Sequence, residues 1–101
     1  MKIRGIIWGN TLEEAKEELT RLKHNYLACH RTITHEVNSP LAGVVEFDDG
    51  DFWEARVPDE QKNHGIKCNI SYVSRLIDPN AIDCVIAPCT SLPPFNALRY
   101  Y

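Results

Sequence analysis

The chain has 101 residues, of which 44% are apolar and 25% are charged, proportions typical of one globular domain with one hydrophobic core. No apolar run approaches the roughly 18 residues of a membrane-spanning helix. The opening residues MKIRG lack the apolar segment of a secretory signal, so we expect a cytoplasmic protein. The formal net charge of −3 argues against non-specific nucleic-acid binding, which needs a basic surface.

The first part of the sequence predicts a strand followed by a long helix. Residues 6–8, IIW, are consecutively apolar, which is typical of a central strand with both faces covered. Thr11 is well placed to cap a helix from Leu12 to about Cys29, and Glu14 would complete a capping box. The apolar residues of this helix recur at steps of three and four and form one stripe: Leu12, Ala15, Leu19, Leu22, Tyr26 and Cys29.

Three strands are expected in the middle of the chain. The stretch RTITHEV alternates polar and apolar residues, which predicts a strand with one buried face. The stretch GVVEFDDGDFWEARV predicts a hairpin. A three-residue loop with Gly50 in the left-handed conformation puts Val45 and Trp53 on one face, whereas a two-residue turn would pair Val45 with Glu54. We prefer the first register because it separates apolar from polar side chains better.

The stretch IKCNISYV predicts another strand, because apolar and polar residues again alternate. Its apolar row is Ile66, Cys68, Ile70 and Tyr72, and its polar row is Lys67, Asn69, Ser71 and Val73. A short helix follows, with Asp78 as its cap and Pro79 at its first position, and Pro88 limits its length. The apolar stripe of this helix is Ile82, Val85, Ile86 and Cys89.

The order of these elements predicts an α+β fold. We expect two layers: a mostly antiparallel sheet of about five strands, with one long and one short helix packed on one face. Residues 1–101 would form a single domain, with residues 90–101 as a proline-rich and aromatic C-terminal tail.

The cysteines and acidic residues predict no metal site, and we expect no cofactor. The four cysteines include no Cys-x-x-Cys pair and match no common zinc spacing, and disulfides are rare in the cytosol. Cys29, Cys68 and Cys89 fall on predicted core stripes, which favours packing roles. The acidic hairpin tip lacks the spacing of a calcium-binding loop.

The stretch DEQKNHGIKCNISYVSRLIDPNAIDCVIAPC, about a third of the chain, resembles the magnesium-site region of phage terminases and related helicase-type ATPases. In that family an acidic-polar segment, an Arg-Gly turn, a strand ending in Asp-Glu and a helix ending near a proline follow in this order. Ser74 and Arg75 stand here in place of the two acids, and arginine cannot coordinate magnesium. The sequence also has no lysine-bearing phosphate loop, so we expect no ATP hydrolysis of that type.

A second resemblance covers more of the chain. The stretches IRGIIWGNTLEEA, FDDGDFWEA, GIKCNISYV and PPFNALRYY are similar to those of small uncharacterised proteins of phages and prophages of Gram-positive bacteria. The resemblance implies a viral accessory protein that acts in the host cell. Many such proteins block host enzymes or bind the nucleotide signals of host immunity, which implies a counter-defence role.

The polar row of the IKCNISYV strand is the candidate ligand surface. If both helices cover one sheet face, this row lies on the other face, where basic side chains would meet a small anionic, nucleotide-like ligand. The alternative is a solvated face without a ligand. The candidate ligand-binding residues are His64, Lys67, Asn69, Ser71, Arg75 and Arg56. A small nucleotide-handling enzyme, with His64 as base, is the second hypothesis.

The tail is a candidate oligomer interface, because aromatic and arginine side chains are enriched in protein interfaces. Its candidate residues are Phe95, Arg99, Tyr100 and Tyr101. They would otherwise pack on their own domain, since a chain end frays unless it is docked. The leading hypothesis is therefore a non-enzymatic, oligomeric phage accessory protein that binds a host protein or a small ligand. A structural protein of the virion or its assembly machinery is the remaining alternative.

Overall fold

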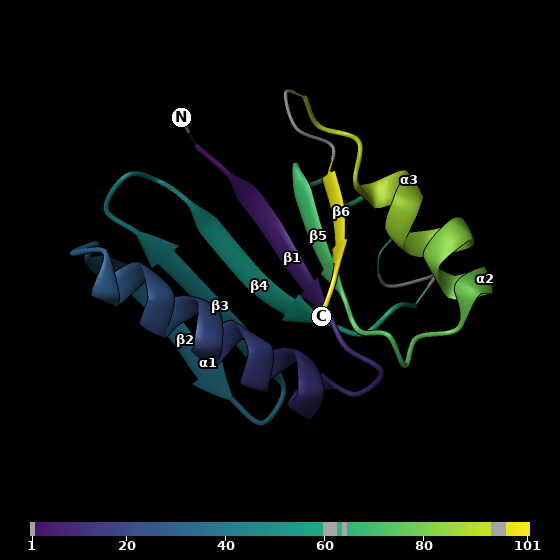
Figure 1. Ribbon diagram of the computed structural model, residues 1–101, viewed down its shortest axis with the longest axis horizontal. Coiled ribbons are helices and arrows are strands. Elements are labelled where there is room, and N and C mark those ends of the chain that lie inside the picture. The colour runs from purple at the N-terminus through teal and green to yellow at the C-terminus, as the bar shows by residue number, and fades with distance from the viewer. Residues whose placement is uncertain (1, 60–62, 64, 94–96) are drawn as a thin grey trace.

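The computed structural model describes residues 2–59, 63, 65–93 and 97–101, and these form a six-stranded sheet with helices on both sides (Figure 1). The strands are β1 (Arg4–Trp8), β2 (Ile33–Ser39), β3 (Ala42–Phe47), β4 (Phe52–Arg56), β5 (Ile70–Val73) and β6 (Ala97–Tyr100). The helical elements are α1 (Leu12–Ala28) and a continuous segment made of α2 (Pro79–Ala81), η1 (Ile82–Ile86) and α3 (Ala87–Cys89). No helix in this part of the chain is long and apolar enough to cross a membrane.

The sheet is mixed, with the strand order β2-β3-β4-β1-β5-β6. Strands β4, β1, β5 and β6 are parallel, whereas the β2–β3 and β3–β4 pairs are antiparallel. The predicted α+β class is confirmed, with β6 as an additional strand. Because β1 lies between β4 and β5, its residues 6–8 are fully buried, as the apolar run predicted.

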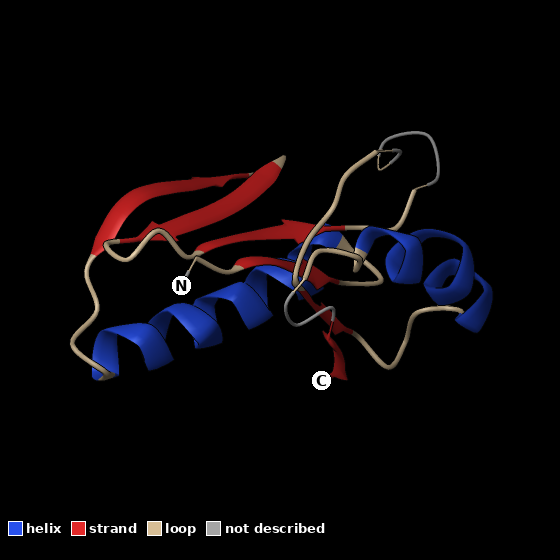
Figure 2. Ribbon diagram, turned by 90° about the horizontal axis from the view of Figure 1, so that it is seen from above, coloured by secondary structure: helices blue, strands red, loops and turns tan. Residues whose placement is uncertain are grey.

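The two helical regions cover opposite faces of the sheet, so the expectation of both helices on one face is wrong. On β1, Ile7 points to the cluster beneath α1, whereas Ile6 and Trp8 point to the cluster beneath the 79–89 segment. Figure 2 shows α1 lying along one side of the sheet. Crossovers between parallel strands are right-handed. The crossover from β1 leads towards β4, and the crossover from β5 leads to β6, on the other side of the sheet. Because the two crossovers run in opposite directions, their helices lie on opposite faces.

Helix α1 begins and ends with local hydrogen bonds. Thr11 Oγ1 accepts from the backbone N–H of Glu14 at 3.2 Å, and Glu14 Oε1 accepts from the backbone N–H of Asn10 at 2.7 Å. The predicted cap is confirmed. At the other end Cys29 is the C-cap and is exposed, so its expected packing role is wrong: it lies beyond the last buried position of the stripe.

The hairpin has the preferred register. Val45 pairs with Trp53, and Gly50 has a φ of 91°, in the left-handed region that glycine adopts without strain. Trp53 Nε1 donates to the Tyr26 hydroxyl at 3.1 Å, which donates to Asp51 Oδ2 at 2.9 Å, so the hairpin is tied to α1. Burial is the main cause that raises the pKa of Tyr26 to about 12, which keeps this hydroxyl a donor at neutral pH.

The short helix ends at Cys89, the last residue of the predicted stripe and one residue after Pro88. Asp78 Oδ1 accepts from the Asn80 backbone N–H at 2.8 Å, as expected of the cap. In η1 the N–H of Ala87 donates to the carbonyl of Ile82, five residues earlier, which is the wider π-type turn. This widening makes room for Pro88, which lacks an N–H and would crowd the carbonyl four residues before it. Three members of the predicted stripe, Val85, Ile86 and Cys89, are buried as expected.

Candidate binding groove and the carboxyl edge of the sheet

In sheets of this kind, ligands usually bind outside the carboxyl ends of parallel strands, where the crossovers diverge. In this chain that point lies between β1 and β5, and the protein's own groups occupy it. The Tyr101 hydroxyl donates to the carbonyl of Trp8 at 2.9 Å, and the N–H of Ser74 donates to the same oxygen at 3.0 Å. The tail residue Tyr101 therefore closes the crevice.

The Tyr101 hydroxyl stays protonated over the physiological range. Burial raises the pKa of Tyr101 well above its ordinary value, and the carboxylates of Glu14 and Glu18 raise it further. The nearby start of α1 has its own cap, because Thr11 Oγ1 accepts from the N–H of Glu14 and the Glu14 carboxylate accepts from the N–H of Asn10, just before the helix. A phosphate at this helix start would have to compete with that carboxylate.

The polar row that sequence analysis placed on an open face is partly buried. Asn69 is buried: its Oδ1 accepts from the N–H of Arg4 at 2.8 Å, and its Nδ2 donates to the carbonyls of Leu92 and Pro93. Ser71 is fully buried beneath the 79–89 segment. The expectation of exposure is wrong for both residues, because the second helix covers this half of the face.

A groove of about 470 Å³ lies at the carboxyl end of β4, where the start of β3 meets the loop after β4. Small-molecule sites usually have volumes of about 300–1,000 Å³ and mostly apolar walls. The apolar lining residues are Leu12, Leu41, Ala42, Gly43, Val44, Ala55, Val57 and Pro58. The polar lining residues are Glu54, Arg56, Asp59 and Asn63. Leu41 is 90% exposed, so one wall of the groove is an uncovered apolar side chain.

A partly buried ion pair lies in this groove. Glu54 is only 9% exposed, and its Oε1 lies 3.1 Å from Arg56 Nε. The geometry between these two atoms does not form a hydrogen bond, so both remain without one despite their burial. Arg56 Nη1 donates to Asn63 Oδ1 at 3.0 Å, and Asn63 Nδ2 donates to the carbonyls of Val57 and Asp59. The loop after β4 is thus attached to the strand through Arg56.

The structure does not bring the sequence-predicted ligand residues together. Arg56 lines the groove, and Lys67 lines a neighbouring hollow of about 330 Å³ that shares Asn63. Arg75 lies in a separate hollow of about 280 Å³, next to Tyr100. His64 lies outside the described residues.

Sequence analysis missed Glu54, Asn63 and Leu41 as groove residues. The hairpin register had placed Glu54 and Arg56 on one side of β4, which was the available signal. No local pattern indicates that Asn63 returns to this strand.

The predicted interface residues separate into docked and exposed ones. Tyr101 packs on its own domain, against the cluster beneath α1. Tyr100 is 52% exposed and Arg99 is exposed, both on the outermost strand β6. Phe95 lies outside the described residues.

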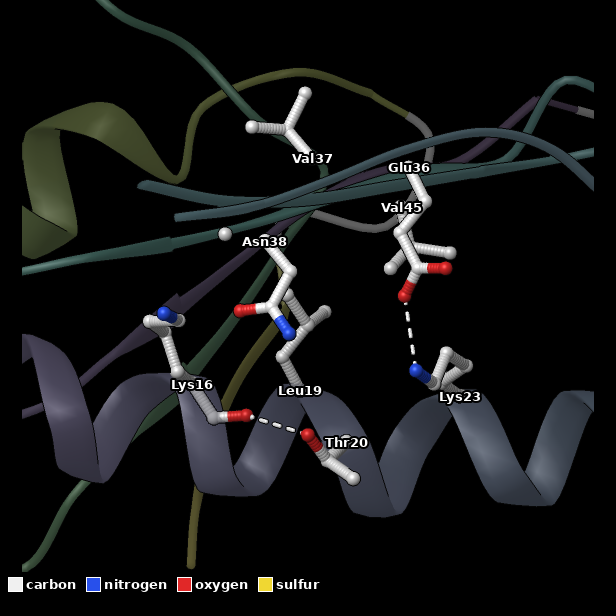
Figure 3. Close-up of a pocket in the computed structure, with 9 residues that line it drawn as sticks. Lys16, Leu19, Thr20, Lys23, Glu36, Val37, Asn38 and Val45 are labelled. Carbon is white, nitrogen blue, oxygen red and sulfur yellow. Dashed lines mark hydrogen bonds and ion pairs between the residues drawn. The ribbon is translucent and has the colours of Figure 1, made fainter. Parts of the chain in front are cut away.

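A further cavity between α1 and β2 is much smaller, about 30 Å³, which is enough for about one water molecule. Figure 3 shows Lys23 on α1 pointing toward Glu36 on β2, and these two side chains form an ion pair at 2.8 Å. Lys16 Nζ donates to the carbonyl of Ser39 nearby. These contacts attach the edge strand to the helix, and we assign them a structural role.

The cysteines offer little reactive chemistry. Cys68 and Cys89 are buried, and burial is the main cause that raises the pKa of both thiols, which disfavours the reactive thiolate. Cys84 is exposed. Among the described residues, no group of three or more His, Cys, Asp or Glu side chains is placed to hold a metal ion.

Comparison with solved structures links this fold to a phage protein. Two crystal structures of large terminase from a thermophilic bacteriophage match the chain with TM-scores of 0.65 and 0.66, and the second is a complex with ADP. Each is 14% identical in sequence and covers 98% of this chain. The chain spans only 26% of the terminase chain. No protein-family model matches the sequence, and a search of curated proteins found no match.

The chain shares its fold with a part of phage large terminase. The resemblance that sequence analysis found in residues 59–89 therefore extends, at the level of the fold, to nearly the whole chain. The identity is too low to carry more than the fold.

Proposed function

We propose that this chain is a non-enzymatic phage or prophage accessory protein that binds a small nucleotide-like ligand in the groove at the end of β4. The observation that carries the proposal is the closed carboxyl edge. Tyr101 contacts the carbonyl of Trp8, and Thr11 and Glu14 cap the helix start. The chain's own residues fill the usual ligand position at the carboxyl edge between β1 and β5. We therefore assign ligand binding to the groove at the end of β4, which is open.

The groove supports binding rather than turnover. Its walls are apolar, and its polar groups, Glu54, Arg56 and Asn63, are attached to one another. Such groups can fix the orientation of a ligand. A phage protein that held a nucleotide signal without changing it would act against host defence, which is the role we propose.

The test is a thermal-shift titration with nucleoside mono-, di- and cyclic phosphates. A ligand at ten times its dissociation constant stabilises a protein by roughly 1.4 kcal/mol, so we expect the melting temperature to rise by at least about 4 °C. Leu41→Asp should abolish this shift because it replaces an apolar wall of the groove with a charge. Leu27→Asp is the matched control, since Leu27 is also an exposed leucine, 44% exposed, and does not line the groove.

Three results would contradict the proposal. One is the absence of any shift across the panel, which would favour a structural role in the virion or its assembly. The second is equal loss of the shift in both leucine variants. The third is turnover of the bound compound, measured by chromatography, which would favour the nucleotide-handling enzyme instead.

We also propose that the chain forms a homo-oligomer through the sheet edge formed by β6. Tyr100 and Leu76 are large, exposed apolar side chains, and Arg75 and Arg99 lie near them in the sequence. Aromatic and arginine residues of this kind are enriched in interfaces. Light scattering should report a dimer or larger species that Tyr100→Ser converts to a monomer. A wild-type chain that stays monomeric at roughly 100 µM, where even a weak specific interface should associate, would contradict this.

A further inference from the structure

We infer that the groove recognises the base of its ligand and not the phosphate. The inference rests on the proposed function and names the part of the ligand that the groove binds. It departs from the expectation of anion recognition, which rested on basic residues that the structure separates into different hollows.

The charges in the groove leave no free cation for a phosphate among the described lining residues. Arg56 is the basic residue that lines it, and its guanidinium already faces the buried carboxylate of Glu54 and the amide oxygen of Asn63. A phosphate would therefore have to compete with the Glu54 carboxylate and the Asn63 amide oxygen for the guanidinium of Arg56.

The same pair fits the edge of a nucleobase. Glu54 is an acceptor and Arg56 a donor, they are adjacent, and together they are neutral. Their complement is a neutral group with a donor and an acceptor side by side. Nucleobases carry such edges, and guanidinium and carboxylate side chains read them in other proteins.

The walls suit a flat apolar ring. Leu41, Val57 and Pro58 line the groove around the ion pair, and both Leu41 and Val57 are exposed. A purine face would cover these side chains and remove them from water. The volume of about 470 Å³ accommodates a nucleoside.

The test compares adenosine, guanosine, AMP, GMP and ribose 5-phosphate by isothermal titration calorimetry. We expect at least one nucleoside to bind within about threefold of its monophosphate, and ribose 5-phosphate not to bind. Raising NaCl from about 50 to about 500 mM should change the affinity by less than about twofold, because no phosphate contact is screened. Glu54→Gln should weaken binding roughly tenfold, since an amide pairs less well with Arg56 and with a donor on the base.

The calorimetry separates failure of this inference from failure of the proposed function. If the nucleotides bind and the nucleosides do not, with affinity that falls steeply with salt, the groove reads the phosphate and the inference is wrong. If no compound binds, the proposed function is wrong as well. Because Glu54→Gln alters a buried pair, its fold is checked by circular dichroism. The salt and nucleoside comparisons on the unaltered chain decide the question if that variant does not fold.

Discussion

At the scale of single residues, Ser71 shows how a polar side chain becomes part of the core. Its Oγ accepts from Trp8 Nε1 at 2.9 Å and lies 2.6 Å from Thr90 Oγ1 and 3.4 Å from Cys68 Sγ. Thr90 Oγ1 in turn donates to the carbonyl of Ile86 at 2.8 Å. This small network joins β1, β5 and the 79–89 segment. The indole N–H of Trp8 has a protein acceptor and needs no water.

Ser71→Ala should therefore destabilise the fold by roughly 1–3 kcal/mol, because it leaves the buried indole N–H of Trp8 without an acceptor. Urea unfolding followed by circular dichroism measures the free energy of unfolding. Ser91→Ala, at an exposed position, is the control and should change it by less than about 0.5 kcal/mol. Equal effects of the two substitutions would argue that the Ser71 network contributes nothing.

Alternation in the sequence predicted the rows correctly only within β5, and it did not predict what covers each row. Ile66 and Cys68 were expected to share a row with Ile70 and Tyr72, but they lie in the cluster on the opposite face, beneath the 79–89 segment. Ile70 and Tyr72 do lie together, against the cluster beneath α1.

Ser71 and Val73 share the opposite row, and both are fully buried. Burial of that row depends on a helix that crosses the other face, and this is set by strand order. Local periodicity carries no information about strand order. The sequence therefore predicted an exposed candidate site on the polar row, whereas Asn69 and Ser71 are buried.

At the scale of elements, the end of α1 contains a residue in an unfavourable conformation. His30 has a φ of 63°, and its N–H donates to the carbonyl of Leu27 while that of Arg31 donates to Tyr26. This is the Schellman arrangement, in which glycine is the usual residue at the left-handed position. A side chain there costs free energy that glycine avoids.

His30→Gly should accordingly stabilise the protein by about 0.5–1 kcal/mol, with the larger backbone entropy of glycine in the unfolded chain limiting the gain. The midpoint of urea unfolding would move to higher concentration with an unchanged slope. His24→Gly, within the same helix, is the opposite control and should destabilise by roughly 0.5 kcal/mol. A loss of stability in His30→Gly would mean that the imidazole makes contacts worth more than the backbone strain.

Two elements escaped prediction for reasons that lie beyond local sequence. Strand β6 has four residues and follows a proline-rich stretch, and its identity as a strand depends on parallel pairing with β5. The π-type turn before Pro88 was not predicted either, although the helix ends one residue after Pro88, as expected. By contrast, the start of α1 and the hairpin register were predictable, because capping and turn residues act within a few positions.

At the scale of the whole molecule, the strand order decides where a ligand has room. Helix α1 covers one face of the sheet at β3, β4 and β1, and the 79–89 segment covers the opposite face at β1 and β5. The face of β3 and β4 that points away from α1 is therefore left without a helix (Figure 1). The groove lies at the carboxyl end of β4, between the first residue of α1 and the loop after β4. The fold is that of a part of phage large terminase, while the crevice between β1 and β5 is closed by Tyr101. The proposed function follows from this combination of a shared fold and a closed edge.

The most direct test of binding in the groove is a two-dimensional ¹H–¹⁵N NMR titration of the unaltered chain with the ligand that the thermal-shift panel selects. We predict that the largest shift changes fall on the backbone amides of residues 41–44 and 54–57, and that the ligand spectrum stays that of the intact compound over a day. Changes centred instead on Gly9, Asn10, Ser74 and Arg75, or conversion of the ligand, would place the site at the carboxyl edge and contradict the account.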